Sequence, residues 1–141
     1  MKKVVIYTDG ACKGNPGPGG WGAIILDGLH ERELCGSDES TTNNRMELMA
    51  AIMALESLQG DCSIAIYTDS KYLVGGMTKW MNGWIKNSWK NSEGKAVKNK
   101  ELWVRLLALS RKRNISWHWV EGHAGQKYNE RVDKLAKSQC H

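Results

Sequence analysis

The sequence predicts an α/β domain built on a five-stranded mixed sheet, which begins as an antiparallel meander and continues with parallel strands. Stretches rich in β-branched and aromatic residues follow one another closely at the start of the chain, whereas later ones are separated by helical patterns. A strand reached through a helical crossover pairs in parallel with the strand before it. With 141 residues, 41% of them hydrophobic, the chain is long enough for one domain with one core.

The elements follow from apolar periodicity and from the residues that flank each run. Strands are expected at residues 3–12, 21–26, 31–37, 63–68 and 114–120. Helices are expected at residues 70–79, 80–87, 100–111 and 126–138. The Gly- and Pro-rich stretch 13–20 predicts a turn, and residues 27–28 predict a hairpin turn. Capping residues at 40–44 introduce a further, largely apolar helix that ends at Gly60, and we expect this helix to be well buried.

Positive charge is concentrated in one segment. Residues 71–113 contain eleven Lys and Arg against two Glu, a net charge of +9, while the other residues carry nine Lys and Arg against thirteen Asp and Glu, a net charge of −4. Six of the seven tryptophans lie in or just after this segment. Basic residues interleaved with aromatic ones are typical of a surface that binds nucleic acid. The alternative is a solvated surface above core tryptophans, which we expect for Trp103 and Trp117.

The remaining composition excludes several classes of protein. Cys12, Cys35, Cys62 and Cys140 form no Cys-x-x-Cys pair and have no histidine at zinc-ligand spacing, so we expect free thiols. No stretch approaches the roughly 18 apolar residues of a membrane span, so no membrane partner is expected. The N-terminus lacks the apolar region and cleavage site of a signal peptide, and we therefore expect a cytoplasmic protein.

One phrase occurs twice in the chain. Val5–Gly10 reads Val-Ile-Tyr-Thr-Asp-Gly, and Ala65–Ser70 reads Ala-Ile-Tyr-Thr-Asp-Ser. Each copy predicts a buried strand that delivers a carboxylate, Asp9 or Asp69, at its C-terminal end. If the two strands are parallel neighbours, these positions lie roughly 5 Å apart, the spacing between strands. A single aspartate at such a place is more typical of a turn, but the repetition favours a shared site.

Two helical carboxylates are candidates to complete that site. Glu47 lies on the largely apolar helix, where a charge must be capped, paired or bound to a metal. The alternative for Glu47 is a capping box with Asn44, three residues earlier. Asp133 either pairs with Lys137 at i,i+4 or points to the C-terminal edge of the sheet.

Four carboxylates at the ends of parallel strands form a hard-oxygen site, which suits Mg²⁺ or Mn²⁺ and not zinc. Two such ions activate a water molecule and stabilise the leaving oxygen in an in-line displacement at phosphorus. An acidic pocket repels a polyanion, so a separate basic surface must hold the substrate. The sequence divides its charge in this way.

These residues lie within longer motifs that resemble the bacterial kind of type 1 ribonuclease H, a family that cuts the RNA strand of RNA/DNA hybrids. The motifs are Tyr7-Thr8-Asp9-Gly10-Ala11-Cys12-x-Gly14-Asn15-Pro16-Gly17, Thr41-Thr42-Asn43-Asn44-Arg45-Met46-Glu47-Leu48, Tyr67-Thr68-Asp69-Ser70, Trp117-x-Trp119-Val120-x-Gly122-His123-Ala124-Gly125 and Asn129-Glu130-x-x-Asp133. The resemblance covers essentially the whole chain. It implies a ribonuclease H-like fold with helices on both faces of the sheet, in a single domain over residues 1–141 with a basic protrusion at about 80–98.

The resemblance also implies roles for individual residues. Asp9, Glu47, Asp69 and Asp133 are the expected metal ligands and, together with His123, the expected catalytic residues. Small polar side chains can read the 2′-hydroxyls in the shallow minor groove of a near-A-form hybrid. The residues expected to contact the RNA strand are Cys12, Asn15, Asn43, Asn44 and Ser70. Those expected to hold the DNA strand are Thr42 and Asn99, at a phosphate, and Trp80, Trp84, Lys79, Lys86, Lys90, Lys95 and Lys98, on the protrusion.

Several of these positions also have a purely structural interpretation. Taken alone, His123 is an exposed loop histidine and Asn15 is a turn residue, while Asn43 and Asn44 are helix caps. Trp80 and Trp84 are equally compatible with helix packing, so their exposure to solvent distinguishes the two interpretations.

Three positions depart from the family pattern. Ser40 and Glu121 stand where basic residues are common, and we expect weaker attraction for the nucleic-acid backbone there. Lys71 stands where a neutral amide is common, and its charge can compensate. None of the three is an expected metal ligand.

The sequence and its resemblance to this family therefore predict a monomeric, Mg²⁺-dependent endonuclease that hydrolyses the RNA strand of RNA/DNA hybrids with little sequence specificity. Two Mg²⁺ ions are expected with substrate, and Mn²⁺ is the expected substitute. The resemblance implies products with 5′-phosphate and 3′-hydroxyl ends. Two alternatives stay open. A non-catalytic hybrid-binding module on the same fold would still bind without divalent metal. A related integrase-like or junction-resolving nuclease would act on a DNA duplex rather than on the hybrid.

Overall fold

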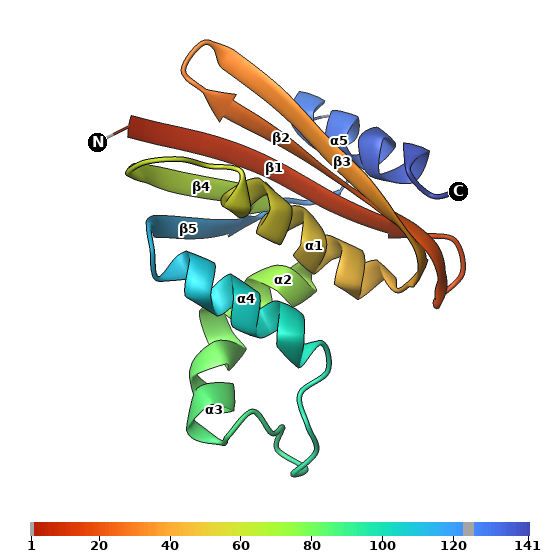
Figure 1. Ribbon diagram of the computed structural model, residues 1–141, viewed down its shortest axis with the longest axis vertical. Helices are drawn as coiled ribbons and strands as arrows, with labels where there is room; N and C mark the ends of the chain where they lie inside the picture. The colour runs from red at the N-terminus through yellow and green to blue at the C-terminus, as the bar shows by residue number, and fades with distance from the viewer. Residues whose placement is uncertain (1, 123–125) are drawn as a thin grey trace.

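A computed structural model describes residues 2–122 and 126–141 and confirms the predicted five-stranded mixed sheet (Figure 1). The strands are β1 (Lys2–Cys12), β2 (Gly17–Asp27), β3 (His30–Thr41), β4 (Cys62–Thr68) and β5 (Asn114–Trp119). The helices are α1 (Asn43–Glu56), α2 (Lys71–Gly75), α3 (Met81–Lys86), α4 (Lys100–Ser110) and α5 (Lys127–Ser138), with a π-helical turn at Gly76–Trp80. Within the described ranges, no helix combines the length and apolar character needed to cross a bilayer.

The strand order is β3-β2-β1-β4-β5. β1, β2 and β3 form the antiparallel meander, and β4 and β5 extend it in parallel with β1. The two copies of the repeated phrase are adjacent and in register, since Tyr7 pairs with Tyr67 and Thr8 with Thr68. β1 continues along β2 as far as Cys12, so only the second copy ends its strand at the aspartate.

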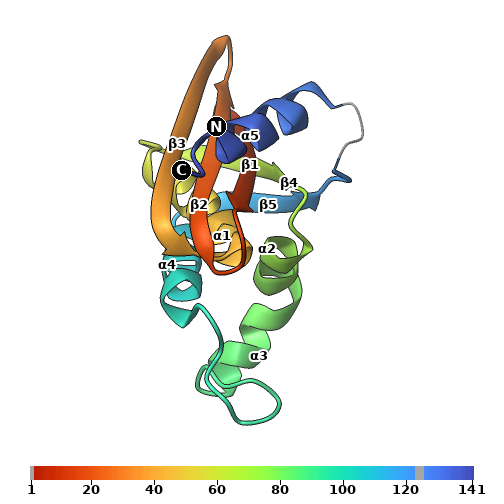
Figure 2. The same ribbon diagram turned by 90° about the vertical axis from the view of Figure 1, so that its right-hand side faces the viewer.

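Helices cover both faces of the sheet, as the resemblance implied (Figures 1 and 2). α1 packs against β1 and β2 on one face, and α4 packs on α1. α5 packs against the same two strands from the opposite face. Because β2 is covered on both faces, its residues from Gly19 to Ile25 are all buried, and they form a nearly continuous apolar run instead of an alternating one.

The start of α1 lies within the predicted cluster of capping residues at 40–44. Its N-cap is Thr42, whose hydroxyl accepts a hydrogen bond from the Arg45 N–H at 3.2 Å. The alternative of a capping box between Asn44 and Glu47 is excluded, because Asn43 and Asn44 are the first, exposed residues of the helix. The Glu47 side chain is therefore not used in a cap, and it lies on the buried face of α1.

The second half of the glycine-rich stretch 13–20 is strand rather than turn. β2 begins at Gly17, earlier than predicted, and Gly19 and Gly20 pair with both neighbouring strands. A Cβ on Gly19 would lie 2.9 Å from the Met46 side chain of α1, and one on Gly20 would overlap a carbonyl of α5. These glycines therefore bring α1 and α5 close to opposite faces of the sheet.

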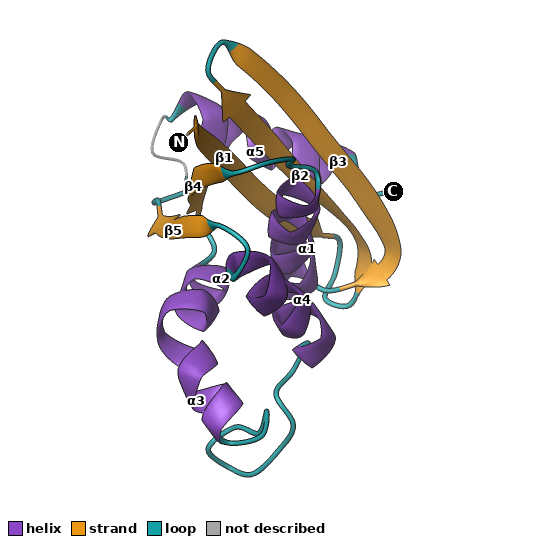
Figure 3. Cartoon of the chain, turned by 60° about the vertical axis from the view of Figure 1, so that its left-hand side comes forward, coloured by secondary structure: helices purple, strands orange, loops and turns teal. Residues whose placement is uncertain are grey.

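The helices after β4 extend away from the sheet as one run (Figures 2 and 3). Two separate short helices were predicted, but a π-helical turn joins α2 to α3 without a loop, and residues 87–99 return to α4. Gly76 lies against the ring of Trp103, where a Cβ would overlap the indole. Trp103 is fully buried and Trp117 is half-buried against the core, as expected.

Candidate active site

Three carboxylates converge where β1 and β4 stop pairing. Asp9 comes from β1, Asp69 from the residue after β4, and Glu47 from α1. One oxygen atom of each lies within 4.8 Å of the others. Asp9 and Glu47 are each 3% exposed, while Asp69 is half-buried. All three line an open cleft of about 600 Å³, to which α5 contributes Asp133.

Gly10 lets these carboxylates meet. Its N–H donates to Oδ1 of Asp9 at 2.9 Å and to Oε1 of Glu47 at 2.6 Å. A Cβ at this position would overlap the backbone nitrogen of Glu47 and would lie 2.5 Å from the carbonyl carbon of Met46. The backbones of β1 and α1 are thus in direct contact, and only glycine permits so close an approach.

The buried carboxylates resist ionisation. Burial, and next the negative charge of Glu47, raises the pKa of the Asp9 carboxyl to about 11. Burial likewise raises the pKa of Glu47 to about 7, although the Gly10 N–H opposes the shift. The charge of Asp69 raises both pKa values further. Two neighbouring carboxyl groups whose pKa values are both raised indicate a site that a cation completes.

The donor set fits a divalent cation. Oδ2 of Asp9 and Oε2 of Glu47 are buried and find no hydrogen-bond partner among the described residues. Buried polar atoms nearly always have a partner, so two free carboxylate oxygens in one cluster indicate a missing ligand. Carboxylate oxygens are the ligands that Mg²⁺ and Mn²⁺ prefer in proteins.

Both alternatives proposed for Asp133 hold at once. Its Oδ2 lies 3.0 Å from Nζ of Lys137. Its side chain also lines the cleft and, with Asp69 and Glu130, a smaller pocket of about 320 Å³. The hydrogen bond to Asp133 raises the pKa of Lys137, which keeps that lysine charged beside the cleft. Asp133 is therefore more exposed than Asp9 and Glu47, and it is paired with a lysine.

The residues predicted to contact the RNA strand gather along one side of the cleft. Cys12, Asn43, Asn44 and Ser70 line it. Asn15 lies beside this group, since its Oδ1 accepts the N–H of Asn43 at 3.1 Å. The loop after β1 and the first turn of α1 are thus joined next to the carboxylates.

Ser70 caps α2. Its hydroxyl oxygen accepts the N–H of Leu73 at 3.0 Å, and its own N–H donates to the hydroxyl of Thr68 at 3.0 Å. The cap uses the hydroxyl oxygen of Ser70 as an acceptor, so the hydroxyl hydrogen can still be donated to a ligand.

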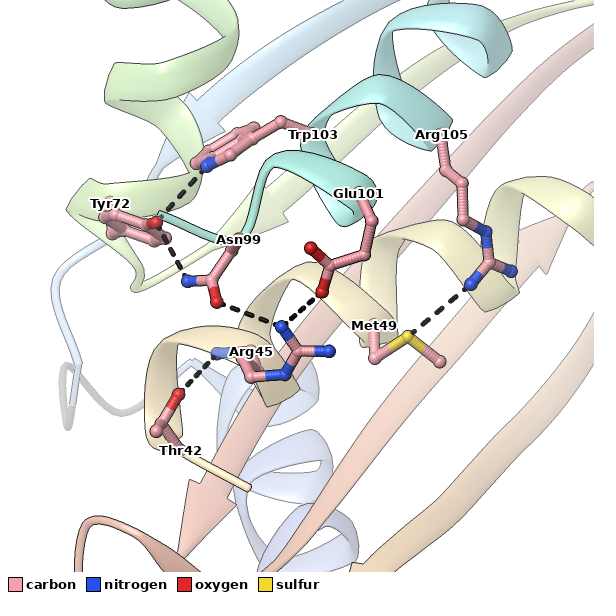
Figure 4. A network of polar contacts seen from close by, with 8 residues as sticks. All are labelled: Thr42, Arg45, Met49, Tyr72, Asn99, Glu101, Trp103 and Arg105. Carbon is pink, nitrogen blue, oxygen red and sulfur yellow. Dashed lines mark hydrogen bonds and ion pairs between the residues drawn. The ribbon is translucent and has the colours of Figure 1, made fainter. Parts of the chain in front are cut away.

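A polar network joins α2 to the start of α4 (Figure 4). Arg45 donates to Oδ1 of Asn99 at 3.0 Å and pairs with Glu101 at 2.5 Å. The amide of Asn99 donates to the Tyr72 hydroxyl at 3.1 Å, and this hydroxyl also accepts the indole N–H of Trp103 at 3.2 Å. Asn99 adopts a left-handed conformation, with φ of 60°, which asparagine tolerates better than most residues.

The same network connects the two residues predicted to share a phosphate. The Arg45 backbone N–H donates to the Thr42 hydroxyl, while the Arg45 guanidinium donates to Asn99. Thr42 keeps its hydroxyl hydrogen, and Asn99 keeps one amide hydrogen, for an external acceptor. Sequence reasoning missed Arg45 and Tyr72, because the contacts that reveal them join residues 27 to 54 positions apart.

Tyr72→Phe tests this network. The substitution removes the acceptor for two N–H groups, one of them on the fully buried Trp103, and we expect the free energy of unfolding to fall by about 1 to 3 kcal/mol. Urea denaturation measures the change. Tyr7→Phe is the matched control, since the hydroxyl of Tyr7 accepts a hydrogen bond from the Gln126 amide and from no other described residue. Equal losses in the two variants would contradict the role given to Tyr72.

The residues predicted for the protrusion divide by exposure. Trp80 is 43% exposed, whereas Trp84 is half-buried and packs on Trp103 with ring centroids 5.1 Å apart. Trp80 is therefore free to contact a ligand, and Trp84 is chiefly a packing residue. The predicted lysines Lys79, Lys86, Lys90, Lys95 and Lys98 are all exposed.

Some cleft residues were not predicted as part of the site. Lys71, Tyr72, Trp119 and Lys137 also line it. Lys71 was visible in the sequence only as a departure from the family pattern, and Trp119 only as part of a motif. His123 lies outside the described residues, and the preceding Gly122 lies beside the carboxylate of Asp69.

Comparisons with known proteins agree with this geometry. The family profile described as RNase H matches residues 1–141. A ribonuclease H of Novosphingobium aromaticivorans is 57% identical over 136 residues, which cover 96% of this chain and 95% of that protein. A ribonuclease H of Rhizobium etli is 56% identical over 137 residues, which cover 97% of this chain and 91% of that protein.

Solved structures show the same fold. The crystal structure of LC9-RNase H1, a type 1 RNase H with the type 2 active-site motif, has a TM-score of 0.89 and 32% identity, and the match covers 99% of this chain and 72% of that one. The crystal structure of LC11-RNase H1 in complex with RNA/DNA hybrid has a TM-score of 0.72 and 28% identity, with 97% and 96% covered. The match to the family along the whole chain, together with the identity to its members, shows that this protein belongs to the RNase H family of metal-dependent nucleases.

Proposed function

We propose that this enzyme hydrolyses the RNA strand of RNA/DNA hybrids, with little dependence on base sequence, and leaves 5′-phosphate and 3′-hydroxyl ends. The observation that carries the proposal is the meeting of Asp9, Glu47 and Asp69 in a cleft whose wall presents small polar side chains. The complex of LC11-RNase H1 with an RNA/DNA hybrid supports this choice of substrate. Small polar groups suit 2′-hydroxyls better than base edges, which is why sequence dependence should be weak.

Asp9, Glu47, Asp69 and Asp133 would hold the metal, which we take to be two Mg²⁺ ions in the presence of substrate, with Mn²⁺ as a substitute. Bound there, Mg²⁺ would supply an activated water for in-line attack and would stabilise the leaving 3′ oxygen. The Gly10 N–H fixes one oxygen each of Asp9 and Glu47 and leaves the other oxygen of each for the metal.

Free donors along the cleft account for the choice of strand. Ser70 can donate its hydroxyl hydrogen to a 2′-hydroxyl, and Asn15 can donate its amide, because its amide oxygen is already used by Asn43. Cys12 and Asn44 complete this RNA-facing side. A DNA strand in the cleft would leave these donors without their 2′-hydroxyl partners, so the cut strand is RNA. We assign His123 to proton transfer or product release.

The DNA strand would lie across Thr42 and Asn99, which hold a phosphate, and along Trp80 and the basic protrusion at about 80–98. Trp84 would support this surface from beneath. This assignment places the carboxylates and the lysines of a single domain on different strands of the substrate. The basic protrusion is thereby assigned to the substrate, and we propose a monomer in the cytoplasm.

Removing the protrusion charge should weaken hybrid binding and reduce its salt dependence. With Lys86, Lys90, Lys95 and Lys98 all changed to Gln, each lost phosphate contact should lower the slope of log Kd against log salt concentration by about 0.9. Fluorescence anisotropy with a labelled hybrid measures the slope. The control changes Lys2, Lys3, Arg111 and Lys112 to Gln, an equal change of charge at the opposite end of the sheet. Equal slopes in the two variants would exclude the protrusion as the binding surface.

A cleavage assay tests the function itself. The enzyme is incubated with Mg²⁺ and a hybrid labelled on either strand, and with a DNA duplex of the same sequence. We expect cleavage of the RNA strand alone, no cleavage after addition of EDTA, and recovery with excess Mg²⁺. Cleavage of the DNA duplex would favour the integrase-like alternative, and hybrid binding without cleavage would favour the non-catalytic one.

A further inference from the structure

A second hollow adjoins the cleft. It encloses about 620 Å³, is mainly apolar, and is lined by Trp80 and Lys79 on the side of the protrusion. Lys71, Tyr72 and Trp119 line both hollows and form the boundary between them. A nucleic-acid backbone that runs from the cleft towards the protrusion therefore passes this boundary.

Lys71 is held at the boundary by an aromatic ring. Its ammonium lies 4.9 Å from the ring centroid of Trp119, which is a favourable cation–π distance. Trp119 is in turn fixed to the catalytic strand end, because its indole N–H donates to the carbonyl oxygen of Asp69 at 3.0 Å. The lysine is thus positioned relative to the carboxylates through one side chain.

Lys71 is also free to bind an anion. No carboxylate of the described residues lies within ion-pair distance of it, whereas Lys137, the other lysine of the cleft, pairs with Asp133 at 3.0 Å. Four carboxyl groups line the cleft, and those that are ionised repel an approaching phosphodiester unless cations lie along its path. A cation already held in place loses less side-chain entropy when a phosphate binds.

We propose that Lys71 receives a backbone phosphate of the cut strand next to the scissile one, and that Trp119 is the positioning residue that holds Lys71 for this contact. The neighbouring phosphate is indicated because the ammonium lies over Trp119, at the boundary, and not among the carboxylates. The cut strand is indicated because Lys71 lines the catalytic cleft. This inference rests on the proposed function, which supplies the strand and the scissile phosphate.

Hybrid binding is measured in the Asp9→Asn background, where the substrate stays intact. Lys71→Gln should weaken binding several-fold and lower the slope of log Kd against log salt concentration by about one, the value for one phosphate contact. Lys71→Arg, which keeps the charge and the stacking, should keep the slope. Lys112→Gln, the same charge change at the far end of α4, should also keep it. An unchanged slope in Lys71→Gln would overturn the phosphate contact.

A double-mutant cycle tests the role of Trp119. If the ring positions the lysine, Lys71→Gln should have a smaller effect on binding when combined with Trp119→Leu than alone, whereas Trp119→Phe should preserve most of its effect. Additive effects of Lys71→Gln and Trp119→Leu would overturn the positioning role. The proposed function fails separately. If the wild-type enzyme leaves the hybrid uncut, the proposed function is refuted. If the wild type cuts the hybrid but Lys71→Gln leaves the salt slope unchanged, only the Lys71 contact is refuted.

Discussion

Asp9→Asn is expected to abolish cleavage and, in the absence of metal, to make the protein more stable. Asparagine keeps the shape of the side chain but removes a metal ligand, so we expect the cleavage rate to fall on the order of a thousandfold or more. Hybrid binding should persist, because the protrusion and the polar wall of the cleft are unchanged. Single-turnover cleavage and anisotropy of the same hybrid measure the two effects.

The gain in stability follows from the raised pKa values. Asp9 and Glu47 hold protons in the folded protein that they release near their ordinary values of 3.8 and 4.5 when unfolded. The unfolded state therefore binds fewer protons from about pH 4 upward, and the free energy of unfolding falls as pH rises towards the folded pKa values of about 7 for Glu47 and about 11 for Asp9. Asp9→Asn removes the larger component, which changes by up to about 1.4 kcal/mol per pH unit.

We accordingly expect the metal-free Asp9→Asn variant to exceed the wild type by about 1 to 3 kcal/mol in free energy of unfolding at pH 8, with a smaller difference at pH 5. Mg²⁺ should narrow the difference, because it stabilises the wild type by binding to its folded state. Asp27→Asn is the matched control: Asp27 is a surface residue that pairs with Lys2, and its substitution should neither stabilise the protein nor affect cleavage. A metal-free Asp9→Asn protein less stable than the wild type at pH 8 would contradict the raised pKa of Asp9.

Gly10→Ala is expected to reduce stability and activity together. The added methyl group would overlap the backbone of α1 at Met46 and Glu47, and backbone atoms cannot turn aside as a side chain can. β1 and α1 must then separate, at a cost of about 3 kcal/mol, the upper end of the usual range for overpacking. Separation also breaks the shared hydrogen bonds to Asp9 and Glu47, so cleavage should fall even where the protein stays folded.

Gly83→Ala provides the comparison for that prediction. Gly83 lies in α3, and a Cβ there meets no atom within 4 Å. Alanine should leave the fold intact and stabilise the helix by about 0.4 to 1 kcal/mol. Thermal unfolding and hybrid cleavage are measured for both variants. Stability and cleavage of Gly10→Ala close to those of Gly83→Ala would show that β1 and α1 are not in the contact described.

Much of the fold could be predicted because strands, helices and crossovers are marked by residues that lie close together in the sequence. The Tyr-Thr-Asp phrases and the helical crossover between them were enough to predict parallel, adjacent strands, and the pairing of Tyr7 with Tyr67 agrees. The ends of the strands and helices were harder to predict where one residue type occurs both in turns and in regular structure. Gly19 and Gly20 resemble turn residues, but in the sheet they allow close packing by helices on both faces. The sequence could not identify Thr42 as the N-cap of α1, because every residue from 40 to 44 is a good capping residue.

The site was predictable to the extent that its residues are chemically unusual in their surroundings. Glu47 on an apolar helix and Asp9 at the end of an apolar run both require a partner, and the structure brings them together with Asp69. Residues that act through long-range contacts carry no such signal. Tyr72 looks like an ordinary helical residue until Trp103, far along the chain, is found donating to its hydroxyl.

The contact between Gly76 and the ring of Trp103 has a consequence for which duplexes the enzyme can accept. It packs the run from α2 to α3 against a fully buried side chain, and the same indole donates to Tyr72 at the edge of the cleft. The protrusion with its lysines and the cleft with its carboxylates therefore both pack on Trp103. We expect the protrusion and the cleft to keep a fixed separation. The enzyme should then select nucleic acids by the width of their groove and not by their base sequence.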